Sequence, residues 1–165
     1  LWTSRQLLPI LFKIIAHDIP NVLEGDDIDY YIKTREERIN GPITKFVPFV
    51  SSSIEEFRKL IDPVRKIIID NNYISGKKPG IEDCIFFGNL KWVDVCSPCN
   101  LLDNKDPVYQ WYKNLNKIIN KQIDRMGFFF EIPERSLIFS QYFPSFFIKK
   151  IHANIAKFII TYIAI

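Results

Sequence analysis

The sequence predicts an all-α fold in which several helices surround one buried central helix, followed by an irregular, aromatic-rich C-terminal tail. Apolar residues recur at helical spacing up to about residue 127, and runs typical of strands are almost absent there. The segment 81–95 is apolar nearly all round, which is typical of a central helix. From residue 128 the periodicity weakens, and this segment holds 8 of the 14 Phe residues. We therefore expect a helical domain over residues 1–127 and an atypical hydrophobic tail over 128–165.

Composition restricts the class of protein. A chain of 165 residues with 47% hydrophobic and 25% charged residues is ordinary for one globular domain. The net charge of +3 is small and scattered, which argues against nucleic acid as a partner. Three Cys residues without a signal-peptide pattern favour a reducing compartment, and no uncharged apolar run approaches the ~20 residues of a transmembrane helix. We expect a cytoplasmic protein without a transmembrane segment.

The first two helices are bounded by clear signals. Pro9 marks either a kink or the first turn of a helix whose apolar face comprises Leu7, Leu8, Leu11, Ile14 and Ile15. Asp26 or Asp27 is expected to be the N-cap of a helix that carries residues 30–38. The stop signal Asn40-Gly41-Pro42 ends that helix.

The later helices follow the same logic. One is expected to start at Ser53, with Glu56 completing a capping box, and Pro63 predicts a bend in it or two shorter helices. Its apolar stripe comprises Phe57, Leu60, Ile61, Val64, Ile67 and Ile68. Asp106 is expected to cap a last helix in which Pro107 takes the first position.

The tail allows three interpretations. Residues 128–165 could be translated non-coding sequence, because AT-rich codons encode Phe, Ile, Lys, Asn and Tyr. They could instead include a genuine C-terminal helix with an apolar face formed by Ile148, Ile151, Ile155, Phe158, Ile159 and Tyr162. The third interpretation is an amphipathic helix at a membrane surface, which the few bases on its polar face disfavour.

Two segments carry a resemblance to a known family. Residues 29–42 read DYYIKTREERINGP, and residues 76–92 read GKKPGIEDCIFFGNLKW, with VCSPCNLLDNKDPVYQW over 95–111. Both resemble the C-terminal domain of glutathione S-transferases, in particular the fungal, etherase-type transferases related to bacterial β-etherases. The resemblance implies an all-helical bundle. In that family the catalytic Ser, Tyr or Cys lies on a preceding thioredoxin-like domain, which we expect to be absent here.

The resemblance identifies Gly80 and Asp83 as the start of the central helix. In the family, the acid at the position of Asp83 is the third helical residue of a capping box, and its carboxylate accepts from free backbone N–H groups. The partner position usually holds Ser or Thr. Here it holds Gly80, so the reciprocal hydroxyl bond is lost at a small cost. We expect both residues to act in folding, and we expect no catalytic residue in the chain.

Substrate-binding residues are implied in the same way. Trp92 would form an aromatic wall for apolar substrates, or would pack in the core at helical spacing. Tyr30, Tyr31 and Arg35 fall in a region that, in the family, lies near the cleft facing the thioredoxin-like domain. There Arg35 would pair with a glutathione carboxylate. The alternative for Arg35 is a solvated helix face.

Cysteine and histidine offer little further chemistry. Cys96 and Cys99 form a C-x-x-C motif, but it follows a helix, whereas thioredoxin-type redox motifs follow a strand. A zinc site would need Cys84, His17 and His152 to complete it, without a second paired set of ligands. We therefore expect two incidental thiols, and neither redox activity nor a bound metal.

The function implied is that of the hydrophobic-substrate-binding domain of a glutathione S-transferase. With a thioredoxin-like domain it would contribute to detoxification, by conjugation or ether cleavage of aromatic electrophiles, with glutathione as co-substrate. Alone it is expected to be inactive. Hydrophobic or aromatic small molecules are the expected partners, and a homodimer is an open alternative to a monomer. A non-catalytic helical protein-interaction module is the second hypothesis, and a small redox protein using the two thiols is a weaker third.

Overall fold

A computed structural model describes residues 2–126, without the side chains of Ser4 and of residues 122–126. Within these residues every regular element is a helix and no strand is present, so the predicted all-α class is confirmed. None of the described helices is long and apolar enough to cross a bilayer. Contacts divide the chain into two compact units, Leu1–Tyr112 and Lys113–Ile165. The interpretations of the tail fall outside the described residues.

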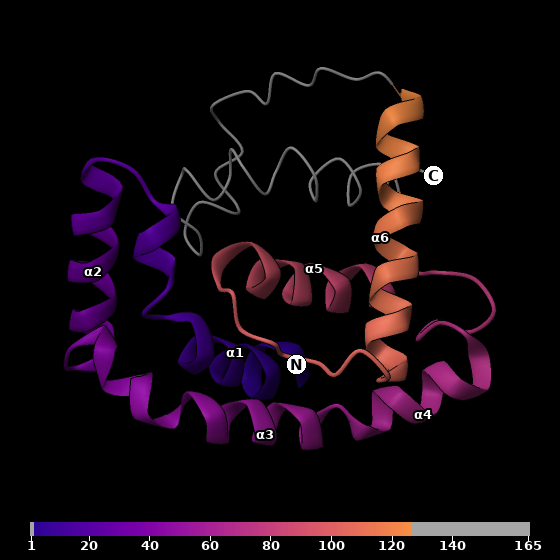
Figure 1. Ribbon diagram of the computed structural model, residues 1–165, viewed down its shortest axis with the longest axis horizontal. Coiled ribbons are helices and arrows are strands. Elements are labelled where there is room, and N and C mark those ends of the chain that lie inside the picture. The colour runs from indigo at the N-terminus through magenta and orange to yellow at the C-terminus, as the bar shows by residue number, and fades with distance from the viewer. Residues whose placement is uncertain (1, 127–165) are drawn as a thin grey trace. The chain divides into compact units, whose positions relative to one another are not determined.

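The helices follow one another along the chain (Figure 1). A π-helical segment, η1 (Thr3–Leu7), leads into α1 (Leu8–Ile15), and a short 3-10 helix, η2 (Ile19–Val22), precedes α2 (Asp26–Ile39). A second 3-10 segment, η3 (Ile43–Phe49), runs into α3 (Val50–Leu60), and α4 (Asp62–Asn71) follows. The last two are α5 (Ile81–Cys96) and α6 (Pro107–Met126).

Helix α1 supplies the centre of the packing in the first unit. Pro9 lies in its first turn, where the missing N–H donor costs nothing. The buried residues of α1 are Ile10, Leu11, Ile14 and Ile15, which largely match the predicted face. The helix packs against α3 and α5. On α3 the fully buried Phe57 is the largest apolar side chain.

Helix α2 ends as the sequence predicts but begins differently. Gly25 is its N-cap, while Asp26 and Asp27 lie within the first turn, where the helix dipole favours negative charge. At the other end Asn40 adopts a left-handed conformation with φ of 51°, and its N–H bonds to carbonyl groups of the last turn. This is the conformation in which helices commonly stop, and Asn tolerates it.

The predicted helix start at Ser53 is wrong. Because η3 continues directly into α3, the helix begins at Val50, and Phe49 stands at the N-cap without a side-chain hydrogen bond. Ser53 is buried within the helix instead. Of the two alternatives at Pro63, two shorter helices are present, and the proline lies in the first turn of α4.

Helix α5 is covered on one side rather than all round. Its buried face comprises Asp83, Cys84, Phe86, Phe87, Leu90, Val93 and Cys96. On another side Ile81 is 53% exposed and Ile85 is 47% exposed. The two isoleucines lie one turn apart, so the apolar composition of this helix exceeds what the described residues bury.

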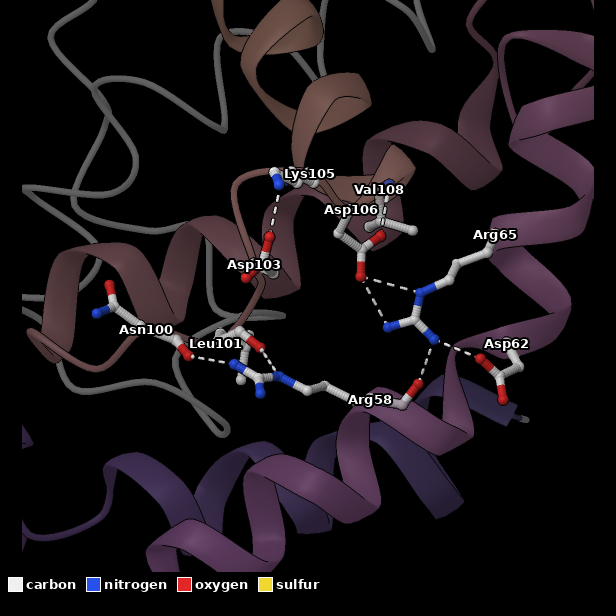
Figure 2. A network of polar contacts seen from close by, with 9 residues as sticks. All are labelled: Arg58, Asp62, Arg65, Asn100, Leu101, Asp103, Lys105, Asp106 and Val108. Carbon is white, nitrogen blue, oxygen red and sulfur yellow. Dashed lines mark hydrogen bonds and ion pairs between the residues drawn. The ribbon is translucent and has the colours of Figure 1, made fainter.

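Arg58 ties α3 to the segment that follows α5 (Figure 2). Its Nε donates to the carbonyl oxygen of Leu101 and its Nη2 to that of Asn100, each at 3.0 Å. These two carbonyls lie outside any helix, so the guanidinium satisfies backbone groups that have no helical partner.

Arg65 joins α4 to the start of α6 in the same network (Figure 2). Its Nε and Nη2 donate to one oxygen of Asp106, at 2.9 and 2.8 Å, and its Nη1 donates to Asp62 and to the carbonyl of Arg58. The other oxygen of Asp106 accepts from the N–H of Val108 at 2.9 Å. Asp106 therefore caps α6, as predicted, while it also holds α6 against α4.

Candidate functional site

A buried carboxylate, that of Asp83, organises the start of α5. Its side chain is 0% exposed. One oxygen accepts from the N–H of Ile74 at 2.9 Å and from the indole Nε1 of Trp111 at 3.0 Å. The other accepts from the N–H groups of Ser75 at 3.0 Å and Gly80 at 3.1 Å. Four donors fill the lone-pair sites of a carboxylate, so this group is engaged in holding the helix start, the preceding turn and α6 together.

Gly80 leaves only half of a capping box. The bond from its N–H to Asp83 is present, but glycine has no hydroxyl to return a bond to the helix. The space where a side chain would stand is filled by Ser75, because a Cβ at position 80 would lie 2.4 Å from its Oγ and 2.6 Å from its Cβ. The Oγ of Ser75 donates to Glu82 at 2.6 Å and lowers the pKa of that carboxyl.

The two adjacent tyrosines of α2 lie in different environments. Tyr31 is buried, and its hydroxyl donates to the carbonyl of Ala16 at 3.1 Å, which fixes α2 to the end of α1. Burial raises the pKa of Tyr31 well above its usual value. Tyr30 is 61% exposed. Of these two tyrosines, Tyr30 is therefore the one that offers an aromatic surface to a ligand.

Arg35 is a half-buried cation one turn after Tyr31. Its guanidinium lies 5.5 Å from the centre of the Tyr31 ring, and its Nη1 contacts the Thr34 hydroxyl at 3.4 Å. Burial lowers the pKa of Arg35, and the neighbouring charge of Arg38 lowers it further. Among the side chains that the structure describes up to residue 121, no carboxylate lies at ion-pair distance from this guanidinium. An anionic ligand would be favourable at this position.

Trp92 occupies a different helix from the other three predicted substrate-binding residues. It is half-buried on α5, whereas Tyr30, Tyr31 and Arg35 share α2. The structure thus brings Tyr31 and Arg35 into contact and leaves Tyr30 exposed beside them in sequence.

The thiols lie in surroundings that disfavour thiolate. Burial raises the pKa of Cys96 to about 12, with the charge of Asp18 adding to the effect, and raises that of Cys84 to about 11. The pKa of Cys99 is also raised, first by burial. Reactive cysteines show the opposite shift. Among the described residues no set of three potential ligands is placed to hold a metal ion.

A polar contact near the motif was not predicted. The hydroxyl of Ser97 donates to Asp18 at 2.5 Å, across 79 positions of sequence, and accepts from the N–H of Cys99 at 3.2 Å. The Nε2 of His17 lies 3.3 Å from the other oxygen of Asp18. The imidazole contacts the carboxylate and not the hydroxyl, so these three groups do not have the Ser–His–Asp order in which a histidine takes the proton of a nucleophilic serine.

Comparison with known proteins identifies the family. The model of the family described as "Glutathione S-transferase, C-terminal domain" matches residues 1–117. No curated protein and no solved structure matches the chain. Since the matched region covers well over half of the 165 residues, the chain belongs to the glutathione S-transferase C-terminal domain family.

Proposed function

We propose that this chain is the hydrophobic-substrate-binding domain of an etherase-type glutathione transferase. The observation that carries the proposal is Arg35, a half-buried guanidinium that lies against Tyr31 and has no carboxylate at ion-pair distance among the described side chains. A cation in this setting is stabilised when an anion arrives, because the anion offsets the desolvation that now lowers its pKa. Glutathione carries such carboxylates.

In this proposal each predicted residue has a distinct role. Arg35 pairs with a carboxylate of glutathione, the co-substrate, while Tyr30 and Trp92 present aromatic surface to the electrophile. Tyr31 positions Arg35 rather than touching substrate. Asp83 and Gly80 start the helix that carries Trp92.

The reaction of the complete enzyme would be attack of the glutathione thiolate on an aromatic electrophile, or on an ether-linked aromatic. A hydroxyl or thiol of a thioredoxin-like domain would stabilise the thiolate, so the 165-residue chain by itself would not catalyse the step. A cytoplasmic role in detoxification would accompany this activity.

The test is a titration of the chain with S-benzylglutathione, which joins the glutathione carboxylates to an aromatic group. Amide shifts in an isotope-labelled chain are expected to concentrate on α2, and Arg35→Ala should weaken binding about fivefold, the value of a partly exposed ion pair. Lys33→Ala removes an exposed cation from the same helix and serves as the matched control. Equal affinities for the parent chain and Arg35→Ala would refute the role of Arg35.

The alternative, a non-catalytic interaction module, is favoured by a different observation. Ile81 and Ile85 are exposed one turn apart on α5, and exposed apolar side chains that adjoin one another often mark contact surfaces. The coding sequence upstream separates the two hypotheses. A thioredoxin-like domain there would favour the enzyme, and a domain of another class would favour the module.

A further inference from the structure

A cleft of about 410 Å³ lies between α1, η3 and the start of α3, away from the residues proposed above. Its volume falls in the range of small-molecule sites, about 300–1,000 Å³. Its lining comprises Lys13, Lys45, Phe46, Phe49, Ser52, Ser53 and Glu56. None of Tyr30, Tyr31, Arg35 and Trp92 contributes to it, so a ligand here would occupy a separate site.

Two aromatic rings give the cleft its apolar surface. Phe46 is held by an edge-on contact with Phe12, with ring centres 6.0 Å apart and an interplanar angle of 77°. Phe49 also lines the cleft, and its side chain is 57% exposed. A large apolar area of the cleft is therefore in contact with water. Covering it with a planar apolar group would remove that area from water. The ligand is thus expected to carry an aromatic ring.

The charges in the cleft sum to one positive unit, from Lys13 and Lys45 against Glu56. Within the described residues neither Lys13 nor Glu56 forms an ion pair. Lys45 donates to the carbonyl of Ile39 and lies 5.3 Å from the centre of the Phe46 ring, which keeps its ammonium beside the aromatic surface. A ligand with one negative charge would balance these three side chains. A second negative charge on the ligand would be repelled by Glu56.

The start of α3 supplies two serines to the cleft wall. Ser52 and Ser53 lie among the first four residues of this helix and line the cleft. The Ser52 hydroxyl donates to the carbonyl of Phe49 at 2.9 Å, so it is fixed at the cleft wall. Two lysines, two serines and two aromatic rings therefore line one concavity.

We propose that this cleft binds a small aromatic carboxylic acid as its monoanion, with the carboxylate at Lys13 and Lys45 and the ring against Phe46 and Phe49. The proposal does not rest on the glutathione transferase function and concerns another set of residues. Selectivity follows from the charge balance. A neutral aromatic alcohol lacks the group that the lysines bind, and a dicarboxylate carries a charge that Glu56 repels.

Calorimetric titration of the whole chain with 2-naphthoate, 2-naphthalenemethanol and naphthalene-2,6-dicarboxylate tests the proposal. Naphthoate should bind at least about fivefold more tightly than either analogue, and Lys13→Met should abolish that preference over the alcohol. Phe49→Ala should weaken naphthoate and the alcohol alike. Helical circular dichroism checks that each variant folds.

Two further variants locate the ligand. Lys66→Met removes an exposed cation of α4 and should leave naphthoate binding unchanged, as should Lys33→Met, which removes an exposed cation of α2. The proposal is overturned if naphthoate does not bind, if the alcohol binds as well as naphthoate, or if Lys66→Met or Lys33→Met abolishes binding while Lys13→Met does not. Failure of these tests would leave the proposed role of Arg35 untouched.

Discussion

The carboxylate of Asp83 accepts a hydrogen bond of 3.0 Å from the indole nitrogen of Trp111, and this bond joins the first turn of α5 to the first turns of α6. Trp111 is buried, and the centre of its ring lies 5.5 Å from the centre of the Phe86 ring. The sequence predicts that Asp83 acts only at the start of its own helix. In the structure this carboxylate also forms a tertiary contact with α6. Loss of the carboxylate would affect two helices and a turn.

Asp83→Ala is expected to lower the free energy of unfolding by about 3–5 kcal/mol, because it leaves buried donors without an acceptor. Trp111→Phe removes one of the four bonds and should cost less, about 1–2 kcal/mol. Urea unfolding measures both, with Asp70→Ala as a control for an exposed acid. A cost for Asp83→Ala no larger than that of the control would contradict the role assigned to this carboxylate.

Gly80→Ser restores the hydroxyl that the family usually has, yet it is expected to destabilise this chain. The new Cβ would meet the Oγ and Cβ of Ser75 at 2.4 and 2.6 Å, so the turn over residues 73–76 would have to shift. Ser75→Gly with Gly80→Ser should recover stability relative to Gly80→Ser alone, because the space is then free. Thermal unfolding of the single and double variants decides this, and a single variant more stable than the parent would refute it.

Stability should fall as the pH rises above about 8.5, the ordinary pKa of a thiol. Burial raises the pKa of Cys96 to about 12 and of Cys84 to about 11, so the unfolded chain loses these protons first. Since the unfolded state then binds fewer protons than the native state, the free energy of unfolding decreases with pH. Tyr31 and Tyr112, whose pKa values burial also raises, extend the loss above about pH 10.

Urea unfolding at pH 7, 9 and 10 measures this alkaline loss, and Cys96→Ala should reduce it by removing one of the groups. The stabilising contribution of the protonated thiols is fully present below about pH 8.5. A variant that loses as much stability as the parent between pH 7 and 10 would show that Cys96 does not contribute.

Arg65→Lys is expected to recover little of the stability lost in Arg65→Ala. The guanidinium donates through three nitrogens to Asp106, Asp62 and the carbonyl of Arg58, and a single ammonium cannot reproduce that fork. The loss for Arg65→Ala should be about 1–3 kcal/mol, because the nearly buried side chain of Asp106 would lose two of its hydrogen-bond donors. Thermal unfolding measures both variants, with Arg38→Ala as the control. A lysine variant with the same midpoint temperature as the parent chain would contradict this prediction.

The sequence predicted best those features that depend on residues adjacent in the chain, such as the ends of helices. Pro9, Pro63 and Pro107 mark helix starts, and the left-handed Asn40 marks a helix end, because these signals act within one turn. The predicted helix start at Ser53 was wrong because the 3-10 segment η3, which has no apolar period of its own, runs directly into α3. The helix therefore begins at Val50, before Ser53. The family resemblance rested on the α2 and α5 segments, and it was confirmed at the level of the C-terminal domain.

Contacts between distant positions could not be predicted from one sequence. Ser97 contacts Asp18 across 79 positions, and Arg65 contacts Asp106 across 41, yet Ser, Asp and Arg are all common on surfaces. The first pair depends on how α1 and α5 pack, and the second on how α4 packs against the start of α6. The same holds for the cleft, whose aromatic rings lie in η3, a segment that periodicity does not identify as structured.

The most direct test of the proposed function is a conjugation assay on the purified 165-residue chain with glutathione and a chlorodinitrobenzene electrophile, alone and after addition of a thioredoxin-like domain from an etherase-type transferase. The proposal predicts a rate equal to the uncatalysed reaction for the chain alone, and a rate above that of either part when the two are combined. Conjugation by the chain alone would contradict the claim that it is the substrate-binding half of a transferase site.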